Sequence, residues 1–271
     1  MARASGREGS TISTDRGTAS SGQRYGSSTS HDEQQWDKLE RLVEEGGHRL
    51  SDVLESFPVY IRRVNLSRFL AHYELYRRVS DLPGNIVDVG VYRGVSLFSW
   101  AQFCEIFHAG DRTKRVVGFD NFAGFTSLSD KDGPDYPKVN KVEGGWDAGP
   151  FYEQLKQHID LFHEDSFLPR AKRIFLVEGE VTESARDFVQ QNPGFRVSLL
   201  HLDIDLYEPT LAALEAFYPC MVKGGVVVFD EYAVTEWAGE TRAVEEYFGD
   251  DLPRIEKFPF TSLPGGFFVK E

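Results

Sequence analysis

Short apolar runs and longer amphipathic stretches alternate along most of this 271-residue chain. The short runs are rich in Val, Ile, Leu and Phe and are bounded by Gly, Pro or Asp, which is typical of buried parallel strands. Apolar residues three and four positions apart follow most runs and indicate helices. The alternation predicts an α/β fold with a doubly wound, Rossmann-like, mostly parallel sheet. The expected strands cover residues 86–89, 115–119, 174–177, 197–204 and 226–229.

Two helical patterns precede the first strand. One covers residues 36–54 with an interruption at 46–47, and Pro58 is expected to end it. The other covers residues 66–79. We expect both to cover the sheet or another subunit, so that residues 36–82 form an N-terminal helical cap. The apolar positions of the second helix are Leu66, Phe69, Leu70, Tyr73, Leu75 and Tyr76.

The two ends of the chain differ in composition. Residues 1–35 are rich in Ser, Thr and Gly and contain almost no large apolar side chain. Such a segment cannot bury enough surface to offset the entropy lost on ordering, so we expect a disordered tail. Residues 254–270 predict two strands around 261–266, which add an antiparallel strand to the sheet. The main domain is expected over 83–271.

Residues 86–96 form the most informative local motif, because a buried strand leads through a glycine turn into a helix. Gly90 and Gly94 let the backbone approach a ligand closely, and Asp88 offers an acceptor to a ligand donor. The spacing Gly-x-x-x-Gly differs from the Gly-x-Gly-x-x-Gly of dinucleotide-binding proteins, which disfavours NAD. Taken alone, the two glycines fit an alternative role in packing the helix on the strand.

Acidic residues follow the next two strands. Asp120 ends the second strand, where a doubly wound fold places the acceptor for the ribose hydroxyls, although it also fits a turn residue before Asn121. Glu178 or Glu180, after the third strand, fits a contact with the adenine side of a nucleotide or a favourable charge at a helix N-terminus.

Between these strands lies a long irregular segment. Residues 123–150 contain five Gly and three Pro without a period. Long loops of this kind inside a compact domain are often lids or binding loops. We therefore expect an insertion close to the ligand.

The ends of the last two strands carry most of the candidate chemistry. Strand geometry places His201, Asp203 and, if the chain stays extended, Asp205 on one side, and the following strand ends in Asp230 and Glu231. Carboxyl ends of parallel strands meet at one edge of the sheet, so these carboxylates are expected in one crevice. A hard divalent cation such as Mg²⁺ or Mn²⁺ would relieve their repulsion.

Each of these residues also has a structural interpretation. Asp residues at strand ends commonly cap the next helix. A lone histidine within an apolar strand, such as His201, is more often a hydrogen-bonded core residue than a catalyst.

Composition limits the function classes. Apolar residues make up 41% of the chain and aromatic residues 13%, which suits one large domain with a full core. The net charge of −13 disfavours nucleic-acid and anionic-membrane partners, so we expect neither. No apolar stretch approaches the roughly 18 residues needed to cross a bilayer. Cys104 and Cys220 lie among apolar residues and are interpreted as buried thiols, which predicts a cytoplasmic protein.

Four blocks together resemble the macrocin O-methyltransferase family over about residues 58–271. The blocks cover residues 82–96, 118–125, 202–210 and 224–232. The resemblance implies a methyltransferase version of the Rossmann-like sheet. It also implies an enzyme that uses S-adenosyl-L-methionine and Mg²⁺ to methylate a deoxysugar hydroxyl of a glycosylated natural product, as in antibiotic biosynthesis.

The resemblance also implies roles for individual residues. Asp203, Asp230 and Glu231 match the metal ligands of the family, and Asp205 matches its proposed general base. The family usually has Asp-Asp where this chain has Asp230-Glu231, which leaves the role of Glu231 as a direct ligand open. The cofactor-binding residues expected from the glycine turn and the strand ends are Asp88, Gly90, Tyr92, Arg93, Gly94, Ser96, Asp120, Phe122, Gly179, Glu180 and Asp203.

Other function classes stay open at this stage. A nicotinamide-dependent oxidoreductase would use a similar turn, but the glycine spacing and the paired carboxylates fit it poorly. A non-catalytic cofactor-binding protein would result if Glu231 disables the metal site. The acceptor can also be a phenol, a catechol or an amino-acid derivative. We expect a small-molecule glycoside acceptor and a homo-oligomer with subunit contacts through the N-terminal helices.

Overall fold

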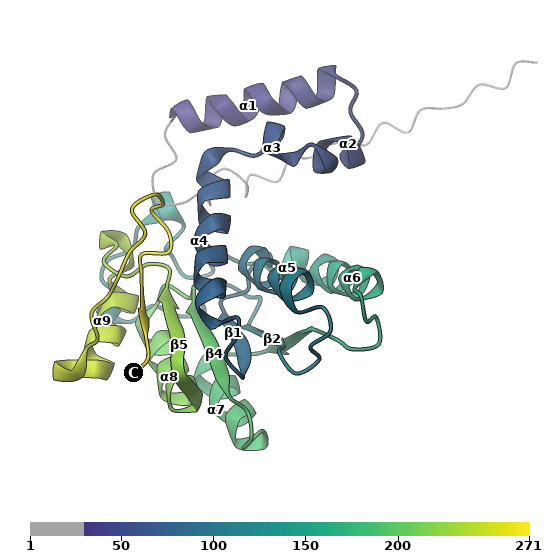
Figure 1. Cartoon of the computed structure of the whole chain (residues 1–271). Helices are drawn as coiled ribbons and strands as arrows, with labels where there is room; N and C mark the ends of the chain where they lie inside the picture. The colour runs from purple at the N-terminus through teal and green to yellow at the C-terminus, as the bar shows by residue number, and fades with distance from the viewer. Residues whose placement is uncertain (1–29) are drawn as a thin grey trace, which may run out of the picture.

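The computed structural model describes residues 30–271, which contain one six-stranded sheet in the order β3-β2-β1-β4-β5-β6. Strands β1 to β5 are parallel, and β6 is antiparallel to β5 (Figure 1). This confirms the predicted doubly wound sheet with an antiparallel C-terminal strand. The strands are Asn85–Val89 (β1), Val116–Asp120 (β2), Ile174–Glu178 (β3), Val197–Leu202 (β4), Met221–Phe229 (β5) and Gly266–Val269 (β6).

Helices cover both faces of the sheet. Because successive strand residues point to opposite faces, Ile86 and Val226 pack on one side with α4, α5 and α6, and Val87 and Val227 pack on the other with α7, α8 and α9. The helices are Arg63–Val79 (α4), Val95–His108 (α5), Gly149–Asp165 (α6), Val181–Gln191 (α7), Tyr207–Phe217 (α8) and Ala238–Phe248 (α9).

The N-terminal helices lie beyond one end of the sheet, and α4 joins them to it (Figure 1). Helices Ser30–Glu45 (α1) and Leu50–Glu55 (α2) are separated at the two glycines, as predicted. We expect Pro58 to end the helical region, but it does not. It occupies the first turn of the short helix Phe57–Tyr60 (α3), where its missing N–H is not needed. Residues 1–29 of the predicted disordered tail lie outside the described residues. Residues 30–35, the rest of the predicted tail, form the first part of α1.

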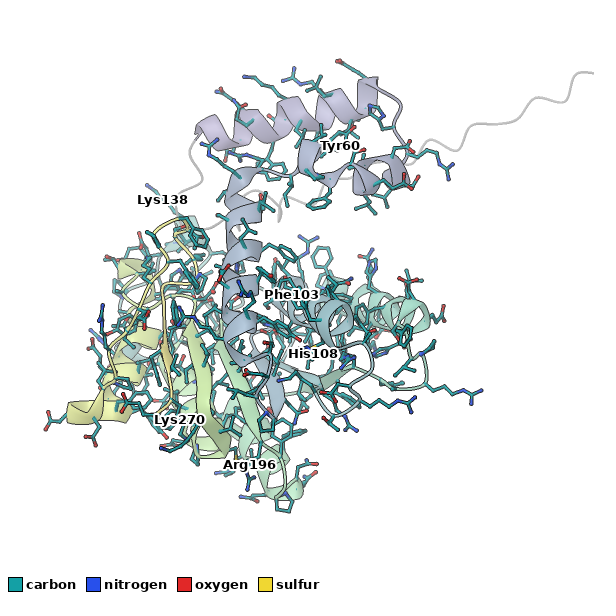
Figure 2. The ribbon with its side chains drawn as sticks, viewed as in Figure 1. Tyr60, Phe103, His108, Lys138, Arg196 and Lys270 are labelled. Atoms are coloured by element: carbon teal, nitrogen blue, oxygen red, sulfur yellow. The ribbon has the colours of Figure 1, made fainter. Side chains whose placement is uncertain are left out.

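Helix α4 buries a different face from the one that its apolar residues predict. Phe69 and Leu70 are 37% and 46% exposed. Phe103 of α5 lies beside α4 (Figure 2). Its ring packs against Phe69, Tyr73 and Tyr76 of α4. The buried residues of α4 are Arg68, Ala71, His72, Leu75, Tyr76 and Val79, so two polar side chains point towards the sheet.

Two strand predictions were wrong in detail. The expected turn at 223–225 lies within β5, because Val197 pairs with Met221 whereas Leu199 pairs with Val226, and the intervening residues form an irregularity in the ladder. The C-terminal segment forms the single strand β6 plus one isolated bridge between Glu256 and Phe267, not two strands. Its prolines at 253, 259 and 264 limit ladder pairing.

Two further observations concern the described residues. Residues 123–148 contain two short 3₁₀ helices, Asp130–Asp132 and Pro137–Val139, and an isolated bridge between Tyr136 and Lys141. No helix in residues 30–271 has the length and apolar character required to cross a membrane.

Candidate active site

A cavity of about 1440 Å³ lies at the carboxyl ends of the strands. Its wall includes the turn after β1 and the residues that follow β2, β4 and β5. Residues 124–129 of the insertion, Trp36 of α1 and Arg68 of α4 also line the cavity. Strand order reverses between β1 and β4, and this is where open α/β sheets bind their ligands.

The glycine turn has two different functions at its two glycines. Gly90 has φ +91° and lines the cavity, and a Cβ there would overlap the carbonyl oxygen of Asp203. Gly94 has φ +88°, and a Cβ there would approach the side chain of Leu155 on α6. Gly90 therefore allows β1 and the segment after β4 to approach each other. Gly94 lies between α5 and α6, so it has a packing role, although against a helix and not against the strand that the alternative interpretation named.

Asp120 holds the turn in place. Its carboxylate accepts hydrogen bonds from the N–H groups of Tyr92 at 2.7 Å and Phe122 at 2.6 Å. Burial raises the pKa of Asp120, and these two hydrogen bonds partly oppose the shift. Asp120 lines the cavity, so it can also accept from a ligand hydroxyl.

Asp88 does not lie where the sequence suggested. It is fully buried and is not among the described residues that line the cavity. Its oxygens accept from Ser96 Oγ at 2.8 Å and Trp100 Nε1 at 3.1 Å, and Oδ1 is 2.6 Å from His201 Nδ1. Because three side chains already surround it, Asp88 supports the site from behind and does not present an acceptor to a ligand.

The remaining cofactor candidates divide into two groups. Gly179 and Phe122 are not among the lining residues in the described chain: the Gly179 N–H bonds the Asp120 carbonyl at 3.0 Å, and Phe122 stacks on Tyr152. Glu180 does line the cavity and accepts from Asn121 Nδ2 at 3.0 Å. Also in the lining are Tyr92, Arg93, Ser96 and Asp203.

Three carboxylates gather opposite the glycine turn. Asp203, Asp205 and Glu231 each offer an oxygen within 4.8 Å of the others. Strand β4 ends at Leu202, and Asp205 has φ +63°, so the extended chain assumed in the sequence prediction does not persist. The left-handed conformation, which Asp tolerates better than most residues, brings Asp205 beside Glu231.

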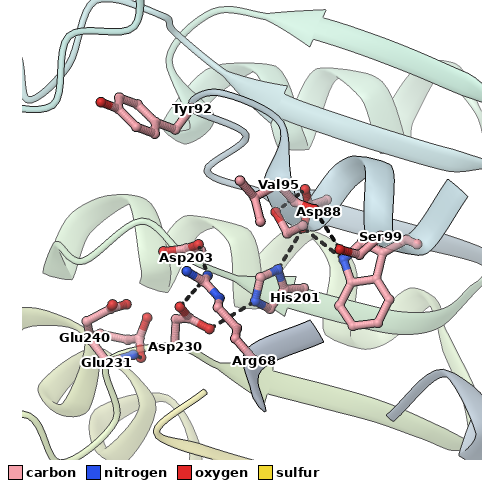
Figure 3. Close-up of polar contacts among 12 residues, drawn as sticks. Arg68, Asp88, Tyr92, Val95, Ser99, His201, Asp203, Asp230, Glu231 and Glu240 are labelled. Carbon is pink, nitrogen blue, oxygen red and sulfur yellow. Dashed lines mark hydrogen bonds and ion pairs between the residues drawn. The ribbon is translucent and has the colours of Figure 1, made fainter. Parts of the chain in front are cut away.

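Asp230 is not one of these three carboxylates, but it shares an arginine partner with Asp203. Arg68 Nη2 contacts Asp203 Oδ2 at 2.7 Å and Asp230 Oδ2 at 2.5 Å (Figure 3). Burial would raise the pKa of Asp230, but Arg68 and the hydrogen bond with His201 lower it to about 2. The pKa of Asp203 is raised to about 6 by burial and by the neighbouring Asp230 carboxylate.

His201 links the two carboxylates on either side of β4. Its Nδ1 is 2.6 Å from Asp88 and its Nε2 is 3.2 Å from Asp230 (Figure 3). Burial lowers the pKa of His201, but the hydrogen bonds with Asp230 and Asp88 outweigh it and raise the pKa to about 10. The interpretation of His201 as a hydrogen-bonded core residue is confirmed.

The acidic cluster extends to a residue that sequence reasoning missed. Glu240 of α9 is fully buried and accepts from the Glu231 N–H at 2.8 Å. Burial, followed by the neighbouring Asp205 carboxylate, raises the pKa of both Glu231 and Glu240 well above the usual value. The pKa of Asp205 is raised well above its usual value by burial and by Asp203.

Arg68 was missed as well, although the sequence contains a signal for it. Positions 68, 72, 75, 76 and 79 recur at helical spacing, and they form the buried face of α4. A charged residue on such a face is rarely buried without a partner. Interpreting Phe69 and Leu70 as the inward face concealed this.

Comparisons with known proteins agree with the geometry. A family model described as a methyltransferase domain matches residues 87–232. Mycinamicin III 3''-O-methyltransferase of Micromonospora griseorubida is 27% identical over 188 residues, which cover 65% of this chain and 66% of that protein. A tetracenomycin-C rhamnosyl 4'-O-methyltransferase of Streptomyces olivaceus is 31% identical over 157 residues, 56% of this chain and 54% of that protein. The chain thus spans less than two thirds of the length of these relatives.

A solved structure matches over more of the chain. The crystal structure of CalS11, a calicheamicin methyltransferase, is 29% identical with a TM-score of 0.83, covering 90% of this chain and 94% of that one. Its apo structure, titled a TDP-rhamnose 3'-O-methyltransferase, has a TM-score of 0.75 at the same identity, with 90% and 96% covered. The resemblance to sugar O-methyltransferases seen in four sequence blocks is confirmed.

Proposed function

The chain belongs to the methyltransferase-domain family, and on that premise we propose that it is an S-adenosylmethionine-dependent O-methyltransferase acting on a sugar hydroxyl. The observation that carries the proposal is that one cavity contains both the glycine turn after β1 and the carboxylates after β4 and β5. One half suits a nucleoside-like cofactor, and the other suits a hydroxyl acceptor.

In the cofactor half, we assign the binding to backbone and acidic groups. The turn at Gly90 brings main-chain groups to the cavity wall, and Asp120 faces it with an acceptor for ribose hydroxyls. Glu180, the residue before α7, also lines the cavity, and we assign it to the adenine side of the cofactor. Asp88 and His201 act only by holding the strands behind this wall.

In the acceptor half, the chemical requirement is a deprotonated oxygen. The methyl group of a sulfonium already has a good leaving group, so the protein must align a hydroxyl oxygen and remove its proton. Asp205 is the proposed proton acceptor, because it lines the cavity next to Asp203 and Glu231. Burial and the neighbouring Asp203 carboxylate raise the pKa of Asp205 well above the usual value.

The donor set fits a hard divalent cation. Asp203, Asp205 and Glu231 offer clustered carboxylate oxygens, and Oε2 of Glu231 is buried without a hydrogen-bond partner among the described residues. We propose that Asp203 and Glu231 hold Mg²⁺, with Asp230 joining them as in the resembling family. When bound, the ion would orient neighbouring sugar hydroxyls and lower their pKa.

The proposed acceptor class is a deoxysugar. Two of the similar proteins are named for a rhamnosyl tetracenomycin and for TDP-rhamnose, both of which contain the deoxysugar rhamnose. The lining of the cavity also includes Trp36, Arg62, Trp237 and Lys257. Aromatic and basic side chains of this kind suit a sugar that is part of a glycoside or of a nucleotide sugar.

The test is calorimetric titration of the purified protein with S-adenosylhomocysteine, followed by transfer of labelled methyl groups to TDP-rhamnose and to rhamnosylated natural products. We expect micromolar binding of S-adenosylhomocysteine and labelled product from at least one of the two sugar classes. Absence of binding would refute the methyltransferase proposal, and binding with transfer only to phenols or catechols would refute the sugar acceptor.

A further inference from the structure

Arg68 lies between two of the proposed metal ligands. It comes from α4, is 8% exposed, and its Nη2 atom contacts Asp203 at 2.7 Å and Asp230 at 2.5 Å (Figure 3). One cationic nitrogen thus bridges the carboxylates that follow two neighbouring strands. Asp203 and Asp230 are also two of the residues that would hold a divalent ion, so Arg68 and the ion would compete for the same carboxylates.

Arg68 also decides which carboxylates remain available to an ion. Oδ2 of Asp230 is bound to Arg68 and Oδ1 to His201, so both oxygens are engaged. The clustered oxygens belong to Asp203, Asp205 and Glu231 instead. While the guanidinium stays in place, Asp230 is withheld from the donor set.

The charges in the cluster are not fully compensated by Arg68. Oε2 of Glu231 and Oε2 of Glu240 are both buried without a hydrogen-bond partner among the described residues. A buried carboxyl oxygen without a partner is costly. Arg68 provides one positive charge to the cluster through Asp203, whereas a divalent ion held by the clustered carboxylates would provide two.

From these contacts we propose that Arg68 is an internal competitor of the divalent cation. Its guanidinium holds Asp203 and Asp230 together when the cation is absent and leaves Asp230 when the cation binds. The inference rests on the proposed metal-assisted function and adds a positioning residue to it. Val64 and Asn65 of the same helix also line the cavity.

The test measures Mn²⁺ affinity by electron paramagnetic resonance of the free ion, using full-length protein freed of metal with EDTA. Arg68→Met removes the charge and keeps much of the side-chain length, so we expect the Mn²⁺ Kd to fall at least about tenfold. Arg68→Lys restores a cation and should return the Kd towards the wild-type value. Arg63→Met is the matched control, because Arg63 is an exposed residue of the same helix outside the cavity lining, and its Kd should not change.

A second measurement needs no variant and covers the case that Arg68→Met does not fold. In ¹⁵N spectra of the wild-type protein, the buried guanidinium of Arg68 should give a slowly exchanging signal that Mg²⁺ abolishes and S-adenosylhomocysteine alone does not. Weaker or unchanged Mn²⁺ binding by Arg68→Met, no Mn²⁺ binding by any of the proteins, or an Arg68 signal that persists at saturating Mg²⁺ would overturn the inference.

Its failure can be told apart from failure of the proposed function. If the protein binds S-adenosylhomocysteine but gives any of these negative results for Arg68, only the competition between Arg68 and the cation is refuted. Competition between Arg68 and Mn²⁺ without S-adenosylhomocysteine binding would support the competition and refute the methyltransferase function.

Discussion

At the scale of single residues, a buried chain of hydrogen bonds determines how the acidic site is held. Asp88 on β1, His201 on β4 and Asp230 after β5 are joined side chain to side chain across three neighbouring strands. Buried charges of this kind are tolerated only when they are paired. His201 thereby compensates two carboxylates and engages Oδ1 of Asp230.

The contribution of His201 to stability should depend on pH. Its folded pKa is raised to about 10, above the roughly 6.5 expected in the unfolded chain, so its stabilisation is complete below about pH 6.5 and declines as the pH rises towards 10. His201→Gln should lower the free energy of unfolding by roughly 3–5 kcal/mol at pH 6, because it leaves buried carboxylates uncompensated. The loss should be smaller at pH 9. Urea denaturation in EDTA at both values measures it.

The exposed His158 provides the comparison. His158→Gln should change the free energy of unfolding by less than about 0.5 kcal/mol at either pH. An equal loss for His201→Gln at pH 6 and pH 9 would contradict a charged imidazole in the folded protein.

A substitution of Asp205 should affect methyl transfer but not cofactor binding. Asp205→Asn removes the proposed proton acceptor and nearly preserves shape, so turnover should fall by about 10²–10⁴-fold while S-adenosylhomocysteine affinity stays unchanged. Labelled methyl transfer and calorimetry measure the two quantities. The control is Asp250→Asn, at an exposed position outside the cavity lining. Loss of cofactor affinity in Asp205→Asn would argue that Asp205 is a cofactor ligand and not a base.

At the scale of elements, the site depends on the close approach of two strand ends. The N–H of Asp203 donates to the carbonyl of Val89 at 2.8 Å, so the segment after β4 continues alongside the end of β1. Gly90 leaves room for the Asp203 carbonyl in this contact. The cofactor turn and the first carboxylate of the acidic cluster are therefore held in one geometry by main-chain contacts.

Gly90→Ala should damage both halves of the cavity. A methyl group would overlap the Asp203 carbonyl at a residue with φ +91°, where alanine is already strained, so we expect a loss of at least roughly 1–3 kcal/mol in stability. S-adenosylhomocysteine affinity should fall in the same variant. Gly110→Ala is the control, because no atom lies within 4 Å of a Cβ there. Wild-type affinity and stability in Gly90→Ala would show that the close approach is not required.

At the scale of the whole molecule, the cavity is assembled from segments that are distant in sequence. Trp36, Arg68, residues 124–129 and Glu231 all line it, yet they come from the first helix, the fourth helix, the insertion and the end of β5. Four sequence blocks located the parts of this wall that lie on the sheet. The homo-oligomer and the cytoplasmic location stay predictions.

The sequence by itself determined the sheet and the composition of the site. Strand patterns at 86–89 and 197–204, each followed by Asp or Gly, were sufficient to predict parallel strands with carboxylates at one edge, because burial and alternation are local properties of the chain. The same patterns identified His201 as a core residue. They failed at 223–225, because a ladder irregularity keeps a glycine pair within a strand.

Only the tertiary structure decided which of these groups face the cavity. Asp88 was a candidate ligand from its position and proved to be enclosed by Ser96, Trp100 and His201. Arg68 of α4 contacts Asp203, which lies 135 residues later in the chain. Glu240 of α9 contacts Glu231, which lies 9 residues earlier. Whether a buried carboxylate meets a cation, a hydrogen-bond donor or another carboxylate depends on the packing of elements, and periodicity along one segment carries no information about that partner.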